Sequence, residues 1–198
     1  MPIETHELVH QLKSTRHYDT CVDLLTVSLE HSPANGLRLE FGYASGHTAR
    51  HISQCSQGKT LYSFDSFEGL PENWNGDNPK GAYACKPPQV PPDGVSLVVG
   101  LFQDTLPSFL AEHRDYVAFV HIDCDLYSST KTVLTQLAPR FVEGTVLNFN
   151  EFWDYPGESE HEAKAFAEFL NETEWLAEPI GWAGKGYIQG AFRLFKER

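Results

Sequence analysis

Apolar residues recur along the chain in two alternating patterns, short continuous runs and stripes at helical spacing. The runs begin near residues 37, 60, 95, 117 and 144, and each is typical of a strand buried on both faces. Stripes such as Val133, Leu134 and Leu137 follow most of the runs. This alternation predicts an α/β fold with a doubly wound, mostly parallel sheet, and residues 180–195 predict a C-terminal antiparallel hairpin.

The 198 residues are expected to form a single domain, because the length suits one α/β domain and not two. Residues 1–36 are interpreted as an N-terminal helical segment, in which Thr20 and Asp23 resemble a capping box. Residues 69–94 lack any periodic pattern, and a long irregular segment is either functional or disordered. We interpret it as a lid or acceptor-binding loop, because Trp74 and Tyr83 are costly in a free loop.

Composition narrows the classes of partner. The chain carries 27 acidic residues against 15 Lys and Arg, a net charge of -12, so nucleic acid is not an expected partner. The four cysteines are widely spaced, which favours free thiols over a disulfide framework or a zinc site. With a polar N-terminus and no apolar run long enough for a membrane span, we expect a cytoplasmic protein without a membrane partner. The sequence leaves a homodimer open.

The candidate chemistry centres on residues 117–134. Four apolar residues are followed by His121, Asp123 and Asp125 at alternate positions, which point to one side if the strand continues. A strand's carboxyl end just before a helix is where open α/β sheets bind ligands. In the alternative interpretation the acids cap the helix and His121 forms a hydrogen bond inside the core.

A glycine-containing turn follows the strand that begins at residue 37. It reads E-x-G-x-x-x-G, from Glu40 through Gly42 to Gly46, and glycines allow a cofactor to approach the backbone. This spacing differs from the dinucleotide-binding motif, and the wider loop suits a zwitterionic amino-acid tail. Ser45 lies in the same turn and is a further cofactor-binding candidate.

Asp65 ends the second strand, where a carboxylate is suited to accept both hydrogen bonds from a ribose diol. A turn or helix cap is the alternative for Asp65. Its neighbour Ser66 is included as a cofactor-binding candidate. Phe102, after the third strand, is placed to pack on an adenine ring, although a core position suits it equally.

The fifth strand carries the remaining candidates. If it is parallel to the central strand, Asp123, Asn150 and Glu151 converge, and their oxygen atoms would suit Mg²⁺ or Ca²⁺ better than zinc. A polar pocket without a metal is the alternative. His161, in the first turn of the following helix, is a candidate base.

Five ordered blocks of sequence carry a family resemblance. L-E-F-G-Y-A-S-G, F-D-S-F-E-G-L-P, G-L-F-Q-D-T-L-P, H-I-D-C-D-L-Y-S-S-T and H-E-A-K-A-F together resemble the macrocin-type O-methyltransferases, class I enzymes that use S-adenosylmethionine. The resemblance implies a Rossmann-like, seven-stranded sheet with its last strand antiparallel. It implies a cofactor held by Glu40, Gly42, Gly46 and Asp65, with Phe102 near the adenine.

The resemblance also implies methyl transfer to a hydroxyl of a small-molecule acceptor, in the best-known members a sugar of a natural product. Such members hold Mg²⁺ with an acid matching Asp123 and two consecutive acids after the fifth strand. Here that pair is Asn150 and Glu151, so one charge is missing and Mg²⁺ is left open.

A sulfonium methyl group is already activated, so the protein must mainly align the reactants and deprotonate the hydroxyl. Asp123 is the first choice for base or metal ligand, and His161 the second. Two alternatives remain. One is a metal-dependent hydrolase that uses His121, Asp123, Asp125 and Glu151, and the other is a methyltransferase-fold binding protein without activity.

Overall fold

One eight-stranded sheet organises the structure, a computed structural model that describes residues 2–197. Across the sheet the order is β1 (Arg16–Tyr18), β7 (Leu176–Ala183), β8 (Ile188–Phe195), β6 (Phe141–Trp153), β5 (Val117–Ile122), β2 (Leu37–Phe41), β3 (Leu61–Asp65) and β4 (Val95–Val99). Only the pairings of β8 with β6 and β7 are antiparallel. The predicted fold class and C-terminal hairpin are confirmed, but the sheet has one strand more than the expected seven.

The additional strand lies in the N-terminal segment that was expected to be helical. Residues 1–36 contain α1 (Thr5–Lys13), β1 and α2 (Cys21–His31). The strand β1 is three residues long and polar, so no apolar alternation marks it; its pairing with β7 fixes it. The capping prediction for α2 is confirmed, because the Asp23 backbone N–H donates to Thr20 Oγ1 at 3.1 Å.

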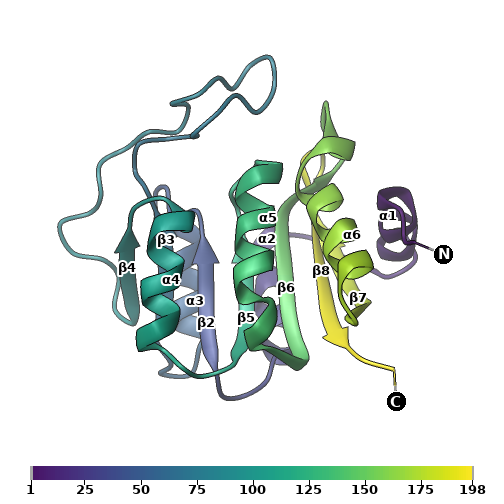
Figure 1. The fold of residues 1–198 in the computed structure, drawn as a ribbon, viewed down its shortest axis with the longest axis horizontal. Coiled ribbons are helices and arrows are strands. Elements are labelled where there is room, and N and C mark those ends of the chain that lie inside the picture. Colours follow the sequence, from purple (N-terminus) through teal and green to yellow (C-terminus); the bar gives the residue numbers. More distant parts are fainter. Residues whose placement is uncertain (1, 198) are drawn as a thin grey trace.

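Two layers of helices cover the sheet (Figure 1). The helices α4 (Phe102–Glu112), α5 (Tyr127–Leu137) and α6 (Glu162–Glu172) lie on one face, whereas α2 and α3 (His47–Cys55) lie on the other. Short 3₁₀ turns, η1 (Ala138–Arg140) and η2 (Glu158–Glu160), flank β6, so the helix expected from residue 158 begins at 162. No helix in residues 2–197 combines the length and apolar character needed to cross a membrane.

Closely packed aromatic rings fix the position of β6 against its neighbours. Phe149 and Phe152 of β6 pack with Phe166 of α6 and Phe192 of β8, and all four side chains are fully buried. Ring pairs of this kind contribute beyond the area they bury. They hold the end of β6, which carries the candidate acid Glu151, in a fixed place.

The order in which the chain adds strands to the sheet reverses at the neighbouring pair β2 and β5, which are parallel to each other. From β2 the chain adds β3 and β4 on one side and then returns to pair β5 with the other side of β2. Ligands of open α/β sheets bind outside the carboxyl ends of the strands at such a switch point. The long loop of residues 66–94 extends over this edge of the sheet, at the top of Figure 1.

Candidate active site

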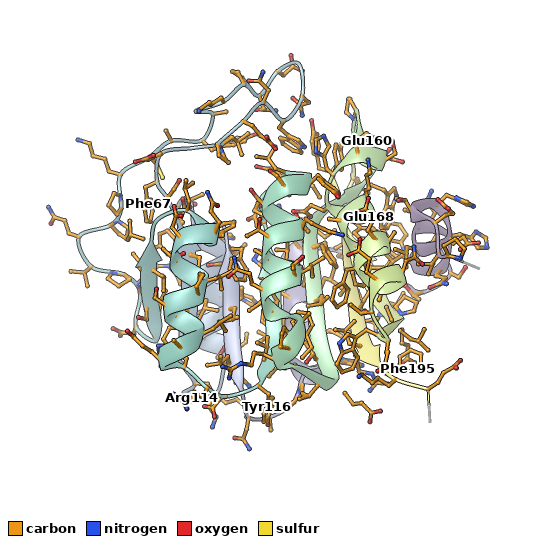
Figure 2. All side chains as sticks on the ribbon, viewed as in Figure 1. Phe67, Arg114, Tyr116, Glu160, Glu168 and Phe195 are labelled. Atoms are coloured by element: carbon orange, nitrogen blue, oxygen red, sulfur yellow. The ribbon has the colours of Figure 1, made fainter. Side chains whose placement is uncertain are left out.

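A cavity of about 390 Å³ lies at the carboxyl edge of the sheet, within the range of small-molecule sites, roughly 300–1,000 Å³. The segments that follow β2, β3, β4 and β5 line it, together with the end of β6 and the β7–β8 turn. Figure 2 shows Phe67 and Glu160 toward this edge of the molecule, and Arg114 and Tyr116 at the opposite edge. The cavity therefore lies where the sequence predicted a ligand site.

Gly42 lines the cavity at the switch point and must be a glycine. Its φ is +107°, and a Cβ there would lie 1.8 Å from the Asp123 carbonyl oxygen. The close approach follows from strand pairing, because the Asp123 N–H donates to the Phe41 carbonyl at 2.9 Å. Gly46 is the N-cap of α3 with φ +73°, beneath the Tyr43 ring, and it does not line the cavity. Ser45 is exposed and outside the cavity.

Asp65 holds the glycine turn in place while it lines the cavity. Its Oδ2 accepts from the N–H groups of Tyr43 at 3.0 Å and Ala44 at 2.8 Å, and its Oδ1 accepts from Phe67 at 2.7 Å. A carboxylate has about four acceptor positions, so three are already used and two ribose hydroxyls would compete for what is left. The spacing of residues could not reveal this second task of Asp65. Ser66 also lines the cavity.

Glu40 lies beneath the glycine turn and not in the cavity. It is fully buried, accepts a hydrogen bond from Ser63 Oγ, and lies 3.3 Å from His121 Nδ1 through Oε1. The structure thus places His121 in the core, as the alternative interpretation predicted, and places neither side chain where it could touch a ligand in the cavity.

A tight turn, and not a continuing strand, brings Asp123 and Asp125 into the cavity. The strand β5 ends at Ile122, and Asp125 has a φ of +62°, so the expected alternation through Asp125 is wrong. Together with Glu151, these two acids place carboxylate oxygens within 4.8 Å of one another. The spacing in the sequence suggested that the acids would lie close together, but on a continuing strand and not on a turn.

Asn150 joins the acids by donating hydrogen bonds. Its Nδ2 donates to Asp123 Oδ1 at 3.1 Å and to Glu151 Oε1, while its Oδ1 accepts from Gln189 Nε2. The convergence of Asp123, Asn150 and Glu151 follows the sequence prediction. As oriented, however, Asn150 presents N–H groups to the carboxylates, whereas a metal ligand would present oxygen.

A fourth acid, Glu162, lies behind the cluster and was not singled out from the sequence. It is fully buried at the start of α6 and accepts from the N–H groups of Glu151 at 3.2 Å and Cys124 at 3.4 Å. In the sequence it could not be told from the solvated acids that commonly begin helices.

The environment raises the pKa of every acid in the cluster. Burial raises the pKa of Asp123 to about 6, with Glu40 and Asp65 adding to the effect and His121 opposing it. Burial and the neighbouring Asp123 raise the pKa of Asp125 to about 7. Burial and the other acids also raise the pKa values of Glu151 and Glu162 well above the usual range for glutamate. Such a cluster favours protons or another positive charge.

The remaining candidates, His161 and Phe102, have separate positions. His161 is half-buried against the rings of Trp74 and Tyr155 and does not line the cavity, and burial lowers its pKa. Its role as a base stays a prediction. Phe102 lines the cavity and also contacts the Phe41 ring at 5.1 Å between centroids, so both interpretations of it fit its position.

The long loop contributes an aromatic wall. Trp74, which is 7% exposed, packs against the rings of Tyr155 and Tyr187, with centroids 5.6 and 5.8 Å apart. The loop is tied to α5, because Ser128 Oγ donates to Glu72 Oε1 at 2.6 Å. Of the 69–94 segment, residues 69–71, 74 and 83 line the cavity. Its function as a lid stays a prediction.

Comparison with known families identifies one match. Residues 39–152 match a family described as a methyltransferase domain. That segment runs from β2 through most of β6 and includes the glycine turn, Asp65, Asp123, Asp125 and Glu151, but not Glu162. No curated protein sequence matches the chain.

Solved structures of methyltransferases share the fold. The calicheamicin methyltransferase CalS11 superimposes with a TM-score of 0.66 at 20% identity, covering 95% of this chain and 79% of that one. The O-methyltransferase NovP gives 0.65 at 21%, covering 89% and 79%. An O-methyltransferase from Bacillus cereus, in complex with SAH, gives 0.58 at 14%, covering 97% and 90%. At these identities the likeness shows the fold.

We expect the substitution Gly42→Ala to weaken binding of S-adenosylhomocysteine at least about tenfold, because a shifted turn misplaces every group that contacts the ligand. Calorimetric titration measures the dissociation constant. Gly76→Ala is the control, since nothing lies within 4 Å of a Cβ at Gly76. Equal affinity of the Gly42→Ala variant and the natural chain would contradict the assignment of this turn.

Proposed function

The chain belongs to the methyltransferase-domain family that residues 39–152 match, and on that premise we propose that it transfers the methyl group of S-adenosylmethionine to a hydroxyl of a small-molecule acceptor. One observation carries the proposal. Gly42 and Asp65, the cofactor candidates, line the same cavity as the acids Asp123 and Asp125, which can accept a proton. The narrower resemblance to macrocin-type enzymes stays a prediction.

The residues at the cavity fit the cofactor. The turn at Gly42 lines the cavity, and Asp123 offers a carboxylate for the ammonium group of the cofactor's amino-acid tail. Asp65 would accept from a ribose hydroxyl with its remaining acceptor position. Leu101 and Phe102 supply an apolar wall for the adenine. When bound, the cofactor supplies a methyl group that is already activated by its sulfonium charge.

We assign the general base to Asp125. Its carboxylate lines the cavity and accepts no side-chain or backbone hydrogen bond within residues 2–197, whereas Asp123 is engaged by Asn150. A pKa of about 7 also suits a base that must be ionised near neutral pH and still take a proton. Asp123 then positions the cofactor side of the cavity, and His161 supports the aromatic wall.

We propose that Mg²⁺ is not required for this transfer. The carboxylates of Asp123, Asp125 and Glu151 are ligands of the kind that Mg²⁺ prefers, and they lie within 4.8 Å of one another. However, Asn150 already donates hydrogen bonds to two of the three, and its oxygen is held by Gln189. Its amide thus does part of what a cation would do between the carboxylates.

The position of His121 weighs against the hydrolase alternative, because that side chain is buried against Glu40 and cannot reach a ligand in the cavity. The binding-protein alternative predicts that the chain binds the cofactor weakly or not at all, or binds it without turnover.

Titration with S-adenosylhomocysteine, followed by a methyl-transfer assay with S-adenosylmethionine, tests the proposed function. We expect micromolar binding and release of S-adenosylhomocysteine in the presence of a hydroxyl acceptor. Binding without release for any acceptor would support the inactive binding protein. No binding at all would contradict the proposal.

The substitution Asp125→Asn is expected to lower kcat by about 10²–10⁴-fold, the usual contribution of a general base. The affinity for S-adenosylhomocysteine should stay unchanged, because Asn has nearly the same shape and tolerates a positive φ. Asp154→Asn is a matched control: Asp154 also has a positive φ, 64°, but is exposed and outside the cavity. Unreduced turnover in Asp125→Asn would remove Asp125 from this role.

A charge at position 150 should create the metal dependence that the natural chain lacks. We expect Asn150→Asp to raise Mg²⁺ affinity by about tenfold or more, since ligand charge sets the affinity of oxygen sites. Calorimetry with Mg²⁺ measures the change, and Asn73→Asp, an exposed loop residue, adds the same charge elsewhere. Tight Mg²⁺ binding by the natural chain, together with loss of turnover in a chelator, would show that the metal is needed.

A further inference from the structure

In the described part of the chain, the acidic and basic residues that line the cavity proposed to bind the methyl acceptor are all acidic. Four carboxylates line it, from Asp65, Asp123, Asp125 and Glu151, and within residues 2–197 no lysine or arginine does. Asp65 accepts from three backbone N–H groups, whereas Asp123 and Glu151 accept only from the amide of Asn150, and Asp125 accepts no hydrogen bond within residues 2–197. A buried carboxylate cluster favours a positively charged occupant over a negatively charged one.

Three arginines lie away from the cavity. Arg114 lies at the opposite edge of the sheet (Figure 2), and Arg140 donates to the carbonyls of Arg114 and Leu110. Arg193 pairs with Glu178 on the β7–β8 hairpin. Lysines 80, 86 and 185 are exposed in the loops around the cavity and do not line it. A phosphate group inside the cavity would therefore meet acids without a facing cation.

Aromatic rings also line the cavity. They belong to Trp74, Tyr83 and Tyr187, and aromatic faces attract ammonium groups. A cavity lined by both aromatic rings and carboxylates is suited to a ring-shaped molecule that carries an amine.

Two residues that line the cavity each carry a buried polar atom without a partner within residues 2–197. They are Trp74, whose Nε1 is a donor, and Glu151, whose Oε2 is an acceptor, on side chains only 7% and 8% exposed. Buried polar groups are nearly always hydrogen-bonded in native proteins, so a bound molecule that met these atoms would find one donor and one acceptor still to be satisfied.

From these observations we propose that the methyl acceptor is an alcohol that carries a protonated amine, and that acceptors bearing phosphate are rejected. The proposal rests on the proposed function and names its acceptor class. In the transfer the S–CH₃ bond of the cofactor breaks and an O–CH₃ bond forms. The hydroxyl proton passes to Asp125, S-adenosylhomocysteine leaves, and the amine keeps its charge throughout.

Three matched probes test the charge selection: glucosamine, glucose and glucose 6-phosphate, which share one ring and differ in charge. Each is titrated into the full chain saturated with S-adenosylhomocysteine, without divalent cations. We expect glucosamine to bind at least about tenfold more tightly than glucose, a difference of about 1.4 kcal/mol, and glucose 6-phosphate to give no measurable binding. The preference should shrink in high salt, because salt screens charge interactions.

The substitution Glu151→Gln removes one ionisable carboxyl group from the cavity with little change of shape. It should reduce the preference for glucosamine over glucose by about fivefold or more while the affinity for S-adenosylhomocysteine, which reports an intact fold, is kept. Glu68→Gln is the matched control, because Glu68 is exposed on the same loop and outside the cavity.

Equal binding of the three probes, preference for the phosphate, or no binding of glucosamine would each overturn the proposal. Loss of the glucosamine preference on addition of Mg²⁺ at millimolar concentration would also overturn it, since the acids would then serve a metal. The titration with S-adenosylhomocysteine distinguishes failure of the proposed function from failure of the proposed acceptor class. If S-adenosylhomocysteine does not bind, the proposed function fails; if it binds and the amine preference is absent, only the acceptor class fails.

Discussion

The close approach of two strand ends at the switch point is the constraint on which the site depends. Pairing of β2 with β5 brings the Asp123 carbonyl to the position that a Cβ on residue 42 would occupy. Only glycine fits, and the turn that follows is held open by Asp65 from the next strand. The same pairing places the acids after β5 beside that turn. Cofactor candidates and proton-accepting candidates therefore share one cavity because three neighbouring strands end together.

The acids in that cavity create a second constraint, because carboxylates cannot gather without compensation. Here the compensation is partial: Asn150 donates to Asp123 and Glu151, backbone N–H groups donate to Glu162, and burial raises the pKa values of all four acids in the cluster. In the proposed function, the amide of Asn150, at a position where the resemblance implies an acid, reduces the need for a metal. The proposed acceptor class follows from the same acids, which links the proposed chemistry to the proposed substrate.

Several parts of the structure followed from local pattern. The apolar runs that begin near residues 37, 95 and 117 fall on β2, β4 and β5. The strands β2 and β5 are buried throughout, as strands inside a parallel sheet are, whereas β4 at the edge is only partly buried. Thr20 caps α2 because the cap needs only residues three apart. By contrast, the sequence pattern does not predict β1, because its three polar residues form a strand by pairing with β7, more than 150 residues away. The helix α6 begins later than its acidic first turn suggested, after a separate 3₁₀ turn.

The sequence by itself determined the order of strands and helices, the glycine turn and the edge at which acids gather, because these depend on residue type and short spacing. The tertiary structure decided what each polar side chain faces. It turned His121 toward Glu40 in the core, packed His161 behind Trp74, bent the chain at Asp125, and buried Glu162 behind the other acids. Most of these outcomes depend on contacts between residues far apart in the chain. The residues next to a side chain in the sequence do not reveal which distant residue it contacts.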